Sequence, residues 1–361
     1  MKKLYIALAI LVCTIVSLSP NVIAEETKTL PTEQTQAVEQ VKDIEILPTM
    51  TSPSLSPNRI WVGTFQIVWN EMMDNIIYGP IRFEKYNSKV AKALNKQEFK
   101  KTNISSNSYY TKYGVVSPDL KSIIEKGIKD KFNETSDILD MFDWTYDPNR
   151  LFVYAMLKKD FKFLTPFDKL SEGTFGKNHT PVEYFGINED SNKKLYKNVN
   201  VLFYNAHNDF AVKLITKDKD TVLLYRTDED KTFDKYFADL KLKNKKYSGS
   251  KKFNTDDKLR IPDINLYQET SFPDVEGHDI KGTMYRIDKT IETVDFKMNN
   301  EGVKLKSEAA IMMKCLAMPF ERGRNFMFTD NFVLFLIEKG QNVPYYAMRV
   351  HDVETLNKTG R

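Results

Sequence analysis

The chain has 361 residues, of which 41% are hydrophobic and 12% aromatic, so it can bury a large core and is not a wholly disordered protein. The formal net charge is only +4 and charges of both signs are interspersed, so nucleic-acid binding has no support. A chain of this length forms one large domain or two small ones.

The first 24 residues have the features of a signal peptide. Lys2 and Lys3 precede an apolar run from Leu4 to Leu18, and Val22-Ile23-Ala24 offers a cleavage site. The run is short for a membrane span. We therefore expect secretion with signal peptide 1–24 removed and no stable membrane insertion afterwards; a retained N-terminal anchor is the alternative.

The next stretch, residues 25–58, is polar and contains no aromatic residue. Two lysines stand against six carboxylates, which gives a net charge of −4. This composition predicts a disordered acidic leader, with ordered structure beginning near Ile60 and a folded domain over residues 59–361.

The first half of the folded part has mainly helical signals. Apolar residues recur at helical spacing in Trp61–Met73, and Ser117-Pro118 is a typical helix start. Further helices are expected over Val90–Phe99 and Glu134–Met141, and a short strand over Asn75–Tyr78 that ends at Gly79-Pro80.

From Leu151 onward the pattern becomes typical of strands. The expected strands are Leu151–Leu157, Asn198–Tyr204, Phe210–Thr216, Thr221–Arg226, Leu259–Tyr267, Thr290–Met298 and Phe332–Ile337. Pro262 marks an edge or a bulge in one of them. Thr232–Leu240 is expected to be a helix, and the basic Lys241–Lys252 stretch a solvated loop. Helices early and strands late predict an α+β fold.

The sequence carries no signature of an enzyme. His179, His207, His278 and His351 lack the spacing of a zinc site, and the chain has no GxSxG, P-loop or GxGxxG motif. Signal removal leaves Cys315 as the remaining cysteine, which excludes a disulfide within the mature chain. We expect a buried apolar thiol, and a reactive Cys315 paired with His207 is the enzymatic alternative. We therefore expect no catalysis, no metal and no cofactor.

Several segments in order resemble serpins. Residues 330–338 (DNFVLFLIE) are similar to the serpin strand that opens with Pro-Phe, with Asn331 in place of the proline. Residues 344–350 (PYYAMRV) are similar to the final strand, with Met348 in place of glycine. Upstream, the matching segments are Asn75–Pro80, Leu151–Phe167, Leu259–Ile264 and Ile287–Gly302. The resemblance covers about residues 60–353. It implies a serpin-like α+β fold with N-terminal helices, large mainly antiparallel sheets, a C-terminal reactive-loop-like segment and a monomeric state.

The resemblance also implies a hinge at Glu301-Gly302, where a serpin's bait loop begins. In inhibitory serpins this loop enters a large sheet as an extra strand once a protease is acylated. One parity of the following segment is largely apolar and comprises Val303, Leu305, Ser307, Ala309, Ile311 and Met313. Its bulky members favour a strand that is permanently paired, because burial of each apolar side chain stabilises the fold by about 1.5–3 kcal/mol. Ser307-Glu308-Ala309-Ala310 is the candidate displaced hinge, since an even insertion preserves strand parity.

Alignment back from Phe332 places the candidate bait bond near Phe320-Glu321, which suits a chymotrypsin-like protease. Arg322 or Arg324 suits a trypsin-like one, and an ordinary exposed turn is the alternative. The expected function is inhibition of a serine or cysteine protease, which would be the partner. The alternative is a non-inhibitory serpin-fold protein with the loop held as a sheet strand.

Overall fold

The computed structural model describes residues 44–218, 220–304 and 323–357. The largest sheet has seven strands, in which β1 runs parallel to β2 and the other neighbours are antiparallel. In spatial order they are β1 (Ile44–Ile46), β2 (Asn58–Val62), β19 (Pro344–Val350), β18 (Phe332–Ile337), β10 (Thr221–Arg226), β9 (Asp209–Ile215) and β8 (Val199–Ala206).

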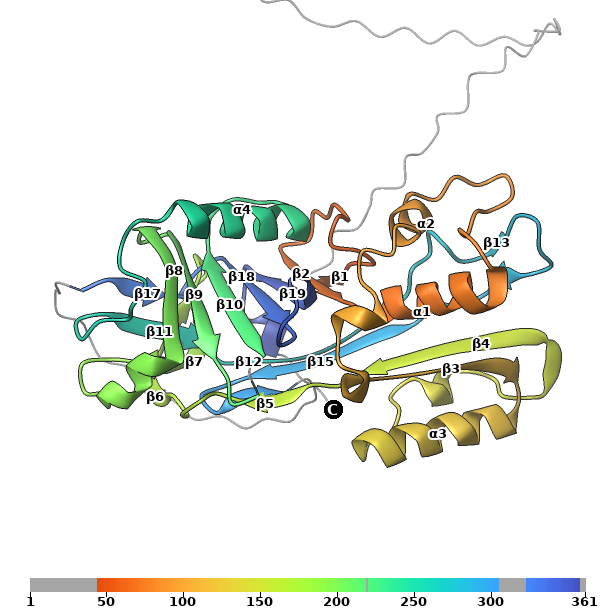
Figure 1. The fold of residues 1–361 in the computed structure, drawn as a ribbon, viewed down its shortest axis with the longest axis horizontal. Coiled ribbons are helices and arrows are strands. Elements are labelled where there is room, and N and C mark those ends of the chain that lie inside the picture. The colour runs from red at the N-terminus through yellow and green to blue at the C-terminus, as the bar shows by residue number, and fades with distance from the viewer. Residues whose placement is uncertain (1–43, 219, 305–322, 358–361) are drawn as a thin grey trace, which may run out of the picture. The chain divides into compact units, whose positions relative to one another are not determined.

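β18 and β19 lie in the core, and every residue of both is buried. Helix α4 (Phe233–Lys246) covers one face of the sheet, where Phe237 lies 5.2 Å from Phe335 between ring centroids (Figure 1). On the other face Tyr346 stacks on Phe296 of β15 (Glu292–Met298) at 4.8 Å. A strand covered on both faces needs a continuous apolar run, which is why β18 was predictable from its pattern, whereas β19, which contains Arg349, was expected from the resemblance.

Two four-stranded sheets flank this core. One has the order β17 (Asn325–Met327), β11 (Lys258–Pro262), β7 (Thr180–Ile187) and β6 (Asp168–Phe175). The other has the order β12 (Ile264–Thr270), β15, β16 (Gly302–Lys304) and β5 (Asp160–Lys162).

The single strand predicted over Leu259–Tyr267 is wrong, because the chain changes sheets within it. β11 ends at Pro262, β12 begins at Ile264, and Asp263 links the two sheets. Pro262 has no N–H to continue the ladder of β11, so the strand ends there.

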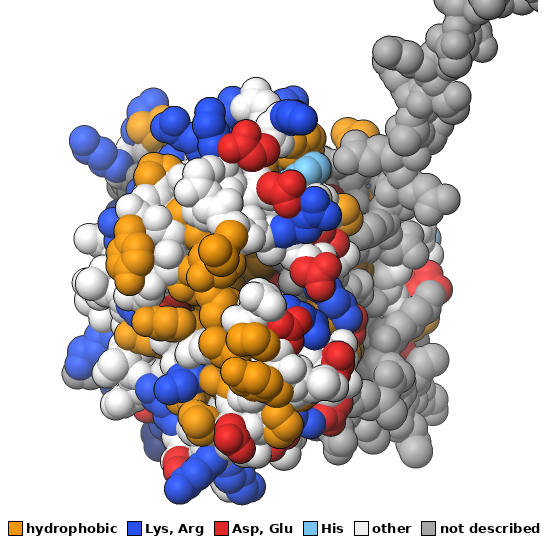
Figure 2. Space-filling view, turned by 90° about the vertical axis from the view of Figure 1, so that its right-hand side faces the viewer, with side chains coloured by type: hydrophobic (Ala, Val, Ile, Leu, Met, Phe, Trp, Pro, Cys, Tyr) orange, Lys and Arg blue, Asp and Glu red, His pale blue; other side chains and the backbone are white. Residues whose placement is uncertain are grey.

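A two-stranded sheet of β3 (Tyr109–Val116) and β4 (Asp147–Leu157) separates two helices (Figure 1). Helix α1 (Thr64–Met72) contacts β4, and α3 (Pro118–Phe132) covers the opposite face through a small apolar cluster of its own. α3 begins as predicted, since the Ser117 hydroxyl accepts the Leu120 N–H at 3.1 Å. Figure 2 shows apolar side chains gathered around a hollow on one face of the molecule.

The remaining elements are short. They are α2 (Lys89–Leu94), the strand pair β13 (His278–Asp279) and β14 (Arg286–Ile287), a π-helical turn η1 (Met73–Ile77), and 3₁₀ turns η2 (Lys101–Asn103), η3 (Ser106–Ser108), η4 (Leu139–Met141), η5 (Lys193–Asn198) and η6 (Thr355–Asn357).

Three local predictions are corrected. The strand expected at Asn75–Tyr78 is instead the π-helical turn that continues α1. The helix expected over Glu134–Met141 shrinks to η4, because a single turn has too few backbone bonds to extend alone. Lys241–Lys246 belongs to α4 rather than a loop, and its lysines lie near the negative end of the helix dipole.

The disordered leader predicted over 25–58 is wrong for residues 44–58. Ile44, Ile46 and Leu47 are buried, and β1 pairs with β2 as the edge of the seven-stranded sheet. The alternation in Ile44-Glu45-Ile46 is a strand pattern, but the acidic and proline-containing surroundings obscured it. Residues 1–43, which include the predicted signal peptide, lie outside the described part of the chain.

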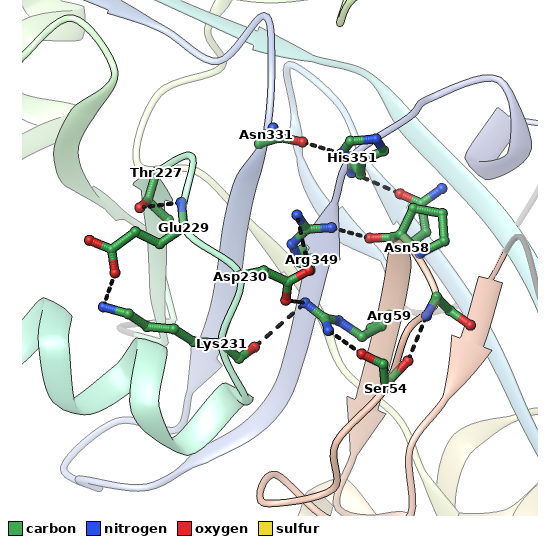
Figure 3. Close-up of polar contacts among 12 residues, drawn as sticks. Ser54, Asn58, Arg59, Thr227, Glu229, Asp230, Lys231, Asn331, Arg349 and His351 are labelled. Atoms are coloured by element: carbon green, nitrogen blue, oxygen red, sulfur yellow. Dashed lines mark hydrogen bonds and ion pairs between the residues drawn. The ribbon is translucent and has the colours of Figure 1, made fainter. Parts of the chain in front are cut away.

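Polar contacts fasten this edge to the rest of the fold (Figure 3). The buried Arg59 donates to the Ser54 carbonyl at 3.0 Å and pairs with Asp230 at 2.5 Å. Arg349 of β19 also reaches Asp230, at 3.7 Å. Asn58 accepts the His351 N–H at 2.8 Å. The segment before β2 is therefore held by the same carboxylate and amide groups that hold the C-terminal strand.

Candidate functional site

The predicted hinge begins inside a sheet. β16 lies between β15 and β5, with Val303 opposite Met298 and opposite Phe161. Val303 is fully buried, as its apolar parity predicted, and Glu301 is exposed. Gly302 is required by close approach, because a Cβ there would overlap the Phe161 carbonyl oxygen. The Glu-Gly pair in the sequence thus marks the point where β16 enters between its neighbours.

β5 is fixed at this position by a buried ion cluster. Lys159, at the junction of β4 and β5, pairs with Asp220 at 2.9 Å and with Glu338. The Tyr345 hydroxyl donates to Asp220 at 3.2 Å. The cluster ties β5 to the seven-stranded sheet and so holds one side of β16.

Beyond the two residue pairs that join β15 to β16, the described residues show no ladder on that edge of β15. β15 pairs with β12 along its length, but with β16 only at Lys297 and Met298. β4 pairs with β3, and no ladder joins β4 to β15 in the described part of the chain. Among the described residues, each of these two strands therefore has a stretch of edge without a ladder, and both stretches line the same space.

That space is a cavity of about 580 Å³, here called the β4–β15 cavity. Its walls are β4 and β15, and α1 contributes the apolar side chains Phe65, Trp69 and Met72. Ala155 of β4 and Met284 also line it, and Met284 is 91% exposed. The apolar hollow in Figure 2 is the kind of surface expected where such a cavity reaches solvent.

Glu292 is the carboxyl group buried in this cavity. It is 4% exposed, and its Oε1 accepts the Phe65 N–H at the first turn of α1 at 3.1 Å. Its Oε2 has no hydrogen-bond partner among the described residues. Burial raises the pKa of Glu292 to about 8, against the lowering effect of the Phe65 N–H.

Sequence reasoning missed Glu292, although a signal was present. Val294, Phe296 and Met298 share its parity on β15 and face the core. Alternate residues of a strand point to the same face, so a glutamate that shares parity with three buried apolar residues is expected to be buried as well.

Arg324, a candidate bait residue, is fastened to its surroundings. Its guanidinium forms two hydrogen bonds with Asp257, at 3.1 and 2.6 Å, and donates to the carbonyls of Ser250 and Lys252. Gly323 precedes it at a point where a Cβ would overlap the Asp256 carbonyl oxygen. Arg324 is thus a structural anchor for β17, and a protease could engage its side chain only after these bonds broke.

The other predicted site residues lie outside the described part of the chain. They are Ser307, Glu308, Ala309, Ala310, Phe320, Glu321 and Arg322, and Cys315 lies there too. Within residues 44–218, 220–304 and 323–357, no cluster of three or more His, Cys, Asp or Glu side chains could hold a metal ion. No helix in those ranges is long and apolar enough to cross a membrane.

No protein-family model and no curated protein matches the chain. Among solved structures, the thermophilic serpin tengpin in its native state is 12% identical, with 84% of this chain and 90% of tengpin covered and a TM-score of 0.51. Maspin is 11% identical, with 81% and 91% covered and a TM-score of 0.50. The α+β architecture and these two likenesses together show that the chain has the serpin fold.

Proposed function

We propose that this chain is an exported, monomeric serpin-like inhibitor of a serine or cysteine protease, with its bait bond near Phe320-Glu321. The observation that carries the proposal is that β15 pairs with β16 only at Lys297 and Met298, while the described residues show no ladder between the rest of this edge and β4 across the β4–β15 cavity. Strand addition between such edges satisfies backbone groups that otherwise stay unpaired.

The observed register supports this use of the cavity. Lys304 lies opposite Lys297, so a continued antiparallel ladder would set Leu305 opposite Phe296 and Ser307 opposite Val294. Ala309 would then come opposite Glu292. Directly opposite residues of paired strands lie on the same face of the sheet. Leu305, Ser307 and Ala309 would therefore lie on the same face as the buried residues of β15. The small residue Ala309 would then lie beside Glu292, which contacts the first turn of α1, and this supports Ser307–Ala310 as the displaced hinge.

Among the candidate bait residues, Phe320 and Arg322 suit the proposal better than Arg324. The Arg324 side chain already serves two carboxylate oxygens and two carbonyls, and those bonds would be lost in a protease pocket.

Incubation with chymotrypsin, trypsin and a papain-type cysteine protease tests the proposal. We expect a complex that survives denaturing electrophoresis, and a rise in melting temperature of the cleaved chain. Ser307→Arg would place a charge on the buried face opposite Val294, so we expect cleavage without complex. Glu308→Arg, on the other face, is the matched control and should still form the complex. Cleavage of the unmodified chain by all three proteases without complex would reject inhibition.

A second candidate is a non-inhibitory serpin-fold binding or structural protein. The burial of Val303 favours it, because the first residues after Glu301 are already paired and Leu305 would extend an apolar strand. It predicts an uncleaved segment that resists proteases, or cleavage with an unchanged melting temperature.

Export rests on the signal peptide proposed at 1–24. Expression with the natural N-terminus should yield secreted protein beginning at Glu25. A cell-associated chain that keeps residues 1–24 would support the anchored alternative.

A further inference from the structure

We propose that the β4–β15 cavity binds a small molecule with a primary amine and an apolar body, the ammonium pairing with Glu292. The proposal goes beyond inhibition, since it needs neither a protease nor the bait segment. Its basis is the cavity's size, its lining and the unpaired carboxylate oxygen within it.

The size and lining suit an apolar ligand. A volume of about 580 Å³ falls within the roughly 300–1,000 Å³ typical of small-molecule sites. Phe65, Trp69 and Met72 line the α1 side. The rings of Phe65 and Trp69 lie 6.4 Å apart between centroids, so they give this side of the cavity an aromatic lining for the apolar body.

Glu292 selects the polar group of the ligand. Its Oε1 is occupied by the Phe65 N–H, while Oε2 is buried without a partner among the described residues. A buried carboxylate is stabilised most by a cation that also donates a hydrogen bond. An alcohol would supply the hydrogen bond without the charge, and a carboxylate ligand would be repelled by the ionised form of Glu292.

The chain's own cations on the cavity lining are engaged elsewhere. Lys158 pairs with Glu134 at 2.8 Å, Arg286 with Asp279 at 2.7 Å and Arg150 with Asp143 at 3.7 Å, while Lys289 donates to the Met141 carbonyl at 3.1 Å. A ligand amine would therefore supply a charge that these side chains do not bring to Glu292.

Calorimetric titration of the uncleaved chain at pH 8 with octylamine, 1-octanol and octanoate tests the proposal. We expect octylamine to bind at least about tenfold more tightly than octanol, as a charge-assisted bond in a dry site implies. Glu292→Gln, which keeps the acceptor for Phe65, should bind octylamine and octanol alike. Glu125→Gln, on the exposed face of α3, is the matched control and should leave the preference unchanged.

A second variant locates the site. Ala155→Phe fills the cavity from β4 and should abolish binding of both ligands while Glu292 stays in place. If that variant does not fold, as circular dichroism would show, the Glu292→Gln comparison decides alone. The proposal is overturned if octylamine does not bind saturably, if octanol or octanoate binds as tightly, or if Glu292→Gln keeps the preference.

Discussion

At the scale of single residues, Glu292 couples the fold to pH. Its pKa of about 8 in the folded chain lies far above the ordinary glutamate value of 4.5. Between these two values the unfolded chain has lost the proton and the folded chain retains it. The free energy of unfolding therefore falls as the pH rises through this window.

Glu292→Gln should remove this dependence. The variant keeps the hydrogen bond from Phe65 but carries no proton to lose. Its stability relative to the unmodified chain should rise between pH 5 and pH 8, on the order of 1 kcal/mol per pH unit. Urea unfolding of both chains at several pH values measures it, and other titrating groups cancel in the difference. A difference that stays constant with pH would contradict the assignment.

At the scale of elements, the seven-stranded sheet depends on a segment that composition alone assigned to a leader. Ile44, Ile46 and Leu47 each bury an apolar side chain, and β1 also covers the edge of β2. Burial of such side chains contributes about 1.5–3 kcal/mol each.

A chain of residues 57–361 should therefore be less stable than one of residues 41–361, by on the order of 5 kcal/mol. Urea unfolding compares the two. Ile46→Asp in the longer chain is the second variant, and it should lower stability in the same direction if the shorter chain does not fold. Equal stability of all three chains would mean that the folded domain begins at residue 59, as the sequence predicted.

The elements that were predictable from sequence are those whose pattern is local. β18 is a continuous apolar run, and the start of α3 has a serine cap followed by proline. The change of sheet at Asp263 was not predictable, because β11 pairs with β7 and β12 pairs with β15, and neither partner is adjacent in sequence. β16 begins at Gly302, where the resemblance predicts a hinge, and the hinge itself stays a prediction. The cavity was not predictable, since β4 and β15 are far apart in sequence and only the fold brings them together.

At the scale of the whole molecule, the C-terminal strands are central even though they follow the predicted bait segment. β18 lies between β10 and β19, and β19 lies between β18 and β2. A chain cut between residues 304 and 323 should therefore elute as one particle in gel filtration, and its two fragments should separate only in denaturant. Release of the C-terminal fragment under native conditions would contradict this arrangement.

The one-residue link at Asp263 has a mechanical consequence. Asp263 joins β11 to β12 in the chain, β11 is hydrogen-bonded to its parallel partner β17, and β12 is hydrogen-bonded to β15. A displacement of β15 together with β12 would therefore be transmitted through Asp263 to β11, whose partner β17 directly follows the anchored Arg324. A cut in residues 305–322 leaves the link at Asp263 intact, so β11 and β12 stay joined in the cleaved chain.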